Sequence, residues 1–432
     1  MTKKACQFWL ASVASVVVLC SRVSAGDVEE LKREIELAQR CYYDGDFSGA
    51  IDACAAAKKL LANDEVRKDL YEDNVRWQAV ECQVLSMQAV IRSEQGDFAS
   101  AEAAIKQAKA VKGRSKEDDA WIDVANGDLL LARAGILVPV GDLGDDWQKQ
   151  SKTRAAYRVR AKKFYETARE VMNDVGINTY GGDNGYRLSS RINAGLGRIL
   201  SGSAAAADSG ARKAMAFAKR QFDDAESDLR NTKLYSDILA PNTKWPLSLK
   251  QLLLQMEQKK LSDSDQDAIH REYSRVIQEW VRLQCDRAEL AAVEAAATNA
   301  QGPQLAEAEA FFRKAKDMCV EHFGPRHPNN SRIDLSQAVF YLGRAVAARD
   351  MAKKGQGGDA REQLKAQYQS FFWDAIFVAE SARKTLSDSL DRKHPLRVDA
   401  LLLELTALDQ GQAVASRPRQ EIVEEINALL GK

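Results

Sequence analysis

The feature that most constrains this chain is a helical pattern that occurs twice near its C-terminal end. In the first copy, Ala308 to Pro328 (AEAFFRKAKDMCVEHFGPRHP), small and aromatic residues recur at steps of three and four residues. This spacing predicts an amphipathic helix that ends at Gly324, with a second helix starting after His327. The same pattern returns 67 residues later, at Ala375, Ala382 and His394-Pro395. The chain therefore repeats a helical hairpin, which favours an array of stacked units over one thick core.

Both copies resemble the tetratricopeptide repeat of the kinesin light chain type, in which a helix reading A-E-x-x-Y/F-x-x-A leads into G-x-x-H-P. The resemblance implies an all-α fold, an α-α superhelical solenoid of antiparallel helical hairpins. Composition agrees, because 8 prolines and 7% aromatic residues suit helices better than a strand-built sandwich. Proteins of this family usually bind segments of other proteins, so the resemblance also implies a scaffold for a protein partner.

Two further units precede these copies. Gly-Asp-Phe occurs at Gly45-Asp46-Phe47 and again at Gly96-Asp97-Phe98, each time followed by alanines at helical spacing. Both units resemble ordinary tetratricopeptide repeats, in which small residues let two antiparallel helices approach closely. The two glycines are 51 residues apart, which is longer than the usual repeat of about 34 residues.

The predicted organisation has four parts. Residues 1–25 are a signal peptide, residues 26–138 hold the N-terminal repeats, residues 149–300 form a degenerate helical repeat region, and residues 301–432 hold the C-terminal repeats with a capping helix. The middle region is assigned because its alanines and aromatics echo the first C-terminal copy, at Ala161, Phe164, Tyr165 and Ala168.

The N-terminus has the pattern of a secretory signal. Lys3 and Lys4 precede an apolar run from Phe8 to Cys20, and the small residues Ser24 and Ala25 stand before Gly26. The apolar run is shorter than the roughly 20 residues that span a bilayer. We therefore expect cleavage after Ala25 and a secreted or periplasmic protein without a membrane span.

Charge and cysteine content narrow the classes of partner and of site. Lys+Arg and Asp+Glu are both 62, so no global charge favours nucleic acid. Five cysteines remain after signal removal, too few for a disulfide framework and without the paired C-x-x-C motif of a structural zinc site. A bond between Cys41 and Cys54 stays open as an alternative to buried free thiols.

No catalytic, cofactor-binding or metal-binding residue is assigned. The four histidines are scattered, and phosphate-loop, serine-elbow and H-E-x-x-H motifs are absent from the sequence. His327 and His394 are expected to shape turns, with proline as the first residue of the next helix.

The strongest local charge is the stretch from Lys149 to Lys163, which holds seven basic residues and no acidic one. Arg154, Arg158 and Lys162 follow each other at four-residue steps and are the candidate residues for binding an acidic partner. The competing interpretation is a solvated helix face.

Two functions follow from the sequence. The first is an exported, non-enzymatic scaffold that binds a peptide or protein in the concave groove of its repeats. The alternative is an exported helical-toroid enzyme or carbohydrate-binding protein, which clustered carboxylates and tryptophans at a solvent-filled centre would favour.

Overall fold

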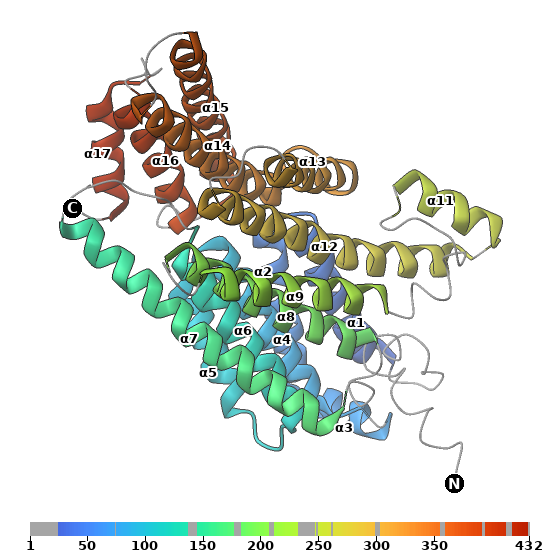
Figure 1. Ribbon diagram of the computed structural model, residues 1–432. Coiled ribbons are helices and arrows are strands. Elements are labelled where there is room, and N and C mark those ends of the chain that lie inside the picture. The colour runs from blue at the N-terminus through green and yellow to red at the C-terminus, as the bar shows by residue number, and fades with distance from the viewer. Residues whose placement is uncertain are drawn as a thin grey trace. The chain divides into compact units, whose positions relative to one another are not determined.

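A computed structural model gives the fold (Figure 1). It describes residues 25–73, 75–136, 145–176, 183–206, 211–231, 247, 249–260, 262–298, 303–354, 359–390, 394–411 and 417–430. Sixteen helices and no strand occur in this part of the chain, which confirms the all-α class. The predicted signal peptide lies outside the described residues except for Ala25, so its cleavage stays a prediction.

The helices follow one another with short connections. The first eight are α1 (Ala25–Tyr43), α2 (Phe47–Leu61), α3 (Asp64–Glu72), α4 (Trp77–Gln95), α5 (Phe98–Ala110), α6 (Lys116–Ala134), α7 (Asp145–Val175) and α8 (Asp183–Ala206). The others are α9 (Ala211–Arg230), α11 (Leu249–Gln258), α12 (Asp263–Thr298), α13 (Pro303–Phe323), α14 (Pro328–Lys354), α15 (Asp359–Ser389), α16 (Pro395–Gly411) and α17 (Arg419–Leu430).

The two Gly-Asp-Phe motifs form the predicted turns, and each residue has its own part. Gly96 ends α4 with a positive φ of 100°, a conformation that glycine adopts without steric cost. Asp97 then caps α5, because its carboxylate accepts the backbone N–H of Ser100 at 3.1 Å. Asp46 caps α2 in the same way, accepting from the backbone N–H of Gly49 at 2.9 Å.

The two His-Pro pairs also lie where the repeat pattern places them. Helices α14 and α16 begin at Pro328 and Pro395, where the missing proline N–H costs no helical hydrogen bond. The preceding histidines are buried, and their ring Nδ1 atoms act as helix caps. Nδ1 of His327 accepts the backbone N–H of Asn329 at 3.2 Å, and Nδ1 of His394 accepts that of Leu396 at 3.1 Å. The expectation that both histidines shape turns is confirmed.

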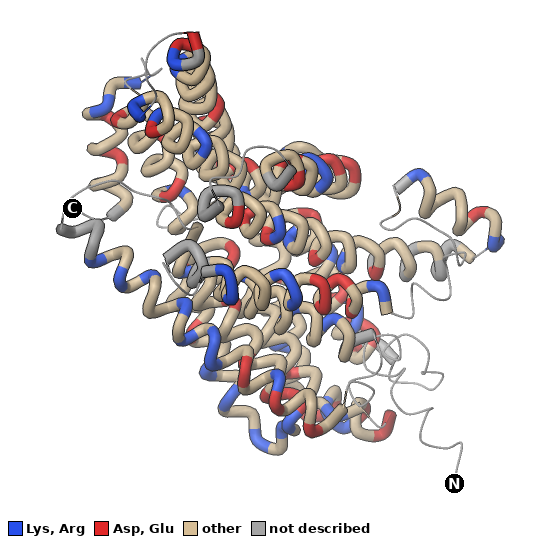
Figure 2. Tube along the Cα trace, in the orientation of Figure 1, with Lys and Arg blue, Asp and Glu red and all other residues tan. Residues whose placement is uncertain are grey.

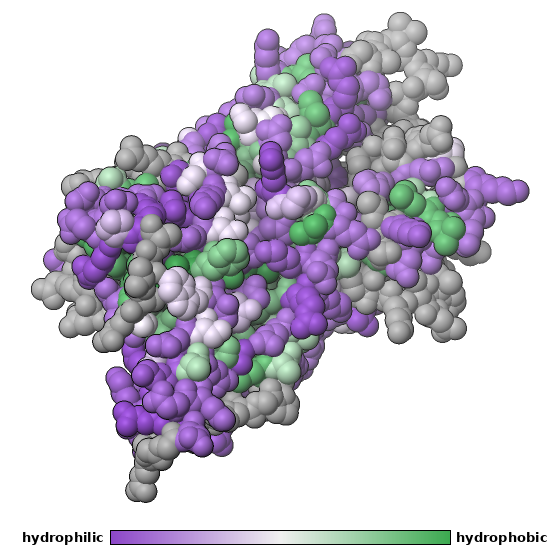
Figure 3. All heavy atoms as spheres, turned by 90° about the horizontal axis from the view of Figure 1, so that it is seen from above, coloured by the Kyte–Doolittle hydropathy of each residue, from purple (hydrophilic) through white to green (hydrophobic). Residues whose placement is uncertain are grey.

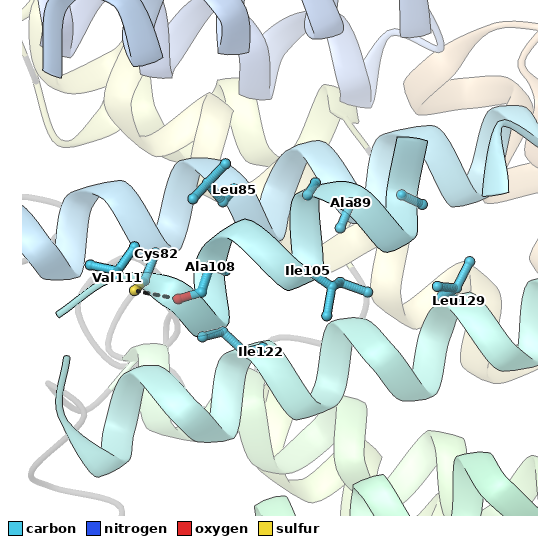
Figure 4. Close-up of a cluster of buried hydrophobic side chains, with 10 residues drawn as sticks. Cys82, Leu85, Ala89, Ile105, Ala108, Val111, Ile122 and Leu129 are labelled. Atoms are coloured by element: carbon cyan, nitrogen blue, oxygen red, sulfur yellow. Dashed lines mark hydrogen bonds between the residues drawn. The ribbon is translucent and has the colours of Figure 1, made fainter. Parts of the chain in front are cut away.

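Small and aliphatic side chains hold the N-terminal helices together. Figure 4 shows a cluster contributed by α4, α5 and α6. Its members, all buried, are Cys82, Leu85, Ala89, Ala101, Ala104, Ile105, Ala108, Val111, Ile122 and Leu129. The alanines let α4 and α5 approach closely, and the larger residues fill the space between the helices.

The repeated alanines near the C-terminus occupy equivalent positions. Ala308 and Ala315 on α13, and Ala375 and Ala382 on α15, have no exposed surface. Helix α15 packs against α14 and α16. Helix α16 is buried on every side from Val398 to Leu408, so it lacks the polar face of a surface helix.

The chain divides into two compact units. Unit 1 takes its described residues from Met1–Leu131, Arg160–Leu196 and Asp223–Glu279, and unit 2 takes them from Ala132–Val159, Gly197–Phe222 and Trp280–Lys432. Helices α7, α8, α9 and α12 each contribute to both units. Within the described residues, no helix has the length and apolar character needed to cross a bilayer.

Candidate interaction surface

Helix α7 carries the basic stretch that the sequence singles out, and Figure 2 shows Lys and Arg along its length. The three candidate residues do not share one exposed face. The Arg154 side chain is only 12% exposed and donates a hydrogen bond to Asp399 of α16, whose side chain is fully buried. The other oxygen of Asp399 accepts the backbone N–H of Ile136 at 2.9 Å. Arg154 therefore neutralises a buried carboxylate inside unit 2.

Arg158 is also turned into its unit. It is half-buried, donates to the backbone carbonyl of Gly135 at 2.9 Å, and has a pKa lowered by burial and by the neighbouring Arg154. Lys162 is exposed and lies 3.5 Å from Glu166, one helical turn further on. The expected stripe of three exposed cations is thus corrected: α16 and the end of α6 occupy the two arginines, and only Lys162 faces solvent.

Other exposed cations lie on the same helix. They are Lys149, Lys152, Arg160 and Lys163. An acidic partner for α7 stays a prediction, and it now concerns these residues and Lys162.

Several charged side chains form internal pairs that no sequence motif indicated. In unit 1, Arg191 of α8 lies 2.6 Å from Asp128 of α6 and 3.6 Å from Glu279 of α12. Arg187 contacts Glu272 at 2.9 Å. Burial raises the pKa of Glu272, but Arg187 and Arg275 outweigh it and the pKa is lowered. In unit 2, Arg198 donates two hydrogen bonds of 2.9 Å to Asp286. These pairs stabilise contacts between helices.

The cysteines are free thiols in the described part of the chain, and Cys41 and Cys54 are not bonded to each other. Burial raises the pKa of the Cys54, Cys82 and Cys319 thiols to about 12, so the reactive thiolate is disfavoured. Among the residues with described side chains, no group of three or more His, Cys, Asp or Glu is placed to hold a metal ion.

Helix α15 presents the clearest apolar surface in unit 2. Trp373 is 47% exposed and Phe377 is 74% exposed, although Phe372, Ala375 and Ile376 beside them are buried. The two aromatics belong to one exposed helix face, which we call the α15 stripe. It consists of Glu362, Ala366, Ser370, Trp373, Phe377, Ser381 and Lys384, all solvent-exposed.

Exposed aromatics of this size are unusual on a surface that is otherwise polar. On the face drawn in Figure 3, apolar residues form separate patches within a mostly hydrophilic surface. The sequence contains the signal for the α15 stripe, because Trp373 and Phe377 are one helical turn apart. It does not show which face of the helix is covered, so the pair reads equally well as core.

No protein-family model, curated protein or solved structure matches this chain. The tetratricopeptide resemblance therefore rests on the residues described above.

Proposed function

We propose that this chain is an exported, non-enzymatic scaffold of tetratricopeptide-like hairpins that binds a protein partner. The observation that carries the proposal is the exposed Trp373 and Phe377 pair on α15. Large aromatic side chains dominate the energetics of protein interfaces, and leaving both in water costs hydrophobic free energy that a partner recovers.

The buried interior of unit 2 supports an outer surface as the binding site. A solenoid of this family uses its concave groove, which requires exposed side chains on the inner helices. Helices α14 and α16 are buried along most of their length, whereas α15 keeps one face open. We therefore propose the α15 stripe as the binding surface in place of a groove.

The chemistry of the side chains favours binding over catalysis. The buried histidines His327 and His394 cap helices, and the buried thiols have raised pKa values. The carboxylates Asp286 and Asp399 lie against arginines. These groups are occupied in structural contacts within the fold.

Site-specific photocrosslinking tests the binding surface. A photoreactive residue placed at Phe377 is expected to form a covalent adduct with a protein in the exported fraction, identified by mass spectrometry. The matched control places the same residue at Tyr71 of α3, an aromatic that is 77% exposed. Adducts at neither position, or equal adducts at both, would contradict the proposed surface.

Export has its own test. N-terminal sequencing of the mature protein is expected to start at Gly26, because the small residues before it fit a signal peptidase site. Retention of Met1 in a cytosolic pool would overturn the localisation.

A further inference from the structure

The α15 stripe has an unusually regular order of side chains. At about 100° per residue, Glu362, Ala366, Trp373, Phe377 and Lys384 fall within a sector of about 60° on one side of the helix. Glu362 and Lys384 stand eleven residues before and after Trp373. The stripe is thus acidic at one end and basic at the other, with its largest side chain at the midpoint.

This order is complementary to itself when two copies run in opposite directions. With a two-fold axis beside Trp373, Glu362 of one copy faces Lys384 of the other, and the reverse pair forms by symmetry. Phe377 then faces Ser370, so each large side chain meets a small one. A parallel arrangement would place like charges together at both ends.

Only weak contacts within the chain compete for these charges. Glu362 is 73% exposed and lies 4.0 Å from Lys365, itself half exposed, and such surface pairs contribute little stability. The face between the two charges, from Ala366 to Ser381, presents no charged residue of the stripe over about 22 Å of helix. That length suits a second helix of similar size.

We propose that a second copy of this chain covers the α15 stripe, with the two α15 helices antiparallel about a two-fold axis beside Trp373. This inference rests on the proposed function and names its partner. The interface is isologous, so both copies contribute the same residues.

Sedimentation equilibrium of the mature chain over a range of concentrations measures the association. The wild type is expected to be a dimer, and Trp373→Ser to weaken dimerisation by about thirtyfold or more, because central tryptophans are typical interface hot spots. Lys353→Glu, an exposed charge change on α14, is the matched control and should leave the dimer intact. Circular dichroism checks that all variants fold.

Charge exchange tests the antiparallel register. Glu362→Lys alone and Lys384→Glu alone should each weaken self-association, because like charges then face each other. An equimolar mixture of these two single variants should form the heterodimer, and the double variant Glu362→Lys/Lys384→Glu should recover the homodimer. A wild type that stays monomeric, or a double variant that fails to recover, would overturn the proposal.

The same measurements separate this inference from the proposed function. A monomeric wild type that still forms adducts with a different protein at position 377 overturns the second copy as partner and leaves the binding function standing. A monomeric wild type without adducts overturns both.

Discussion

At the residue scale, Arg154 and Lys162 look equivalent in the sequence but have different environments. Arg154 is the ion-pair partner of the fully buried Asp399, and burial raises the pKa of Asp399 against the opposing effect of this arginine. Arg154→Ala should therefore lower the free energy of unfolding by about 3–5 kcal/mol, since it leaves a buried carboxylate without its counter-ion. Lys162→Ala, at an exposed position, should change it by about 0.5 kcal/mol or less. Denaturant unfolding measures both; equal effects would contradict the assigned roles.

The histidine caps provide a second comparison at this scale. His394→Ala removes the acceptor for the backbone N–H of Leu396, and a lost cap typically costs about 1 kcal/mol. His394→Asn shortens the side chain as well but keeps an oxygen able to accept this N–H. The asparagine variant should therefore unfold at a higher denaturant concentration than the alanine variant. The capping role fails if the two variants unfold together.

Sequence reasoning succeeds at these turns and fails at Arg154 for one physical reason. Gly96, Asp97 and the His-Pro pairs act on backbone groups within a few residues, so the local sequence contains their partners. Arg154 and Asp399 are 245 positions apart. Helical spacing shows that Arg154, Arg158 and Lys162 share a side of α7, but not that other parts of unit 2 cover most of that side.

At the scale of helices, close packing depends on the repeated alanines. Ala315 and Ala382 have no exposed surface, so a leucine at either position would push neighbouring helices apart. Overpacking typically costs about 1–3 kcal/mol, and both variants should melt at lower temperature than the wild type. Ala347→Leu, at an exposed position on α14, is the control and should have little effect. Unchanged melting of both buried variants would contradict the repeat assignment.

Periodicity predicts helices such as α13 well because one face is apolar and the other polar. It is a weaker guide to α14 and α16, which are buried nearly all round, and the His-Pro pairs located their starts instead. The α15 stripe shows the opposite difficulty. Its apolar residues extend beyond the buried face, and only the packing of α14 and α16 on α15 distinguishes core from surface.

At the scale of the whole molecule, equal numbers of acidic and basic residues are accompanied by extensive pairing of charges inside each unit. The balance was plain from composition, but its distribution was not. Carboxylates such as Asp286, Asp399 and Glu404 are almost fully buried because arginines from distant segments reach them. The stability of the protein should therefore depend on pH through these buried groups.

Glu404 of α16 gives the sharpest test of that dependence. Its side chain is fully buried, neither oxygen accepts a hydrogen bond within the described part of the chain, and the nearest cation, Nε of Arg383, is 3.5 Å away. Burial raises its pKa, Glu380 adds to the rise, and Arg383 opposes it. Because the folded state holds this proton more tightly than the unfolded state, ionised Glu404 destabilises the fold above its folded pKa, and the penalty fades as the pH falls to the unfolded value near 4.3.

Glu404→Gln should accordingly be more stable than the wild type near neutral pH, by about 1.4 kcal/mol for each unit of pKa shift. The difference should shrink as the pH is lowered and vanish below about pH 4, where the wild-type carboxyl is protonated in both states. Denaturant unfolding of both proteins from pH 4 to pH 8 measures it, with exposed Glu307→Gln as the control. A glutamine variant that is less stable at neutral pH would show that the attraction of Arg383 outweighs burial, reversing the order of the two effects at this carboxylate.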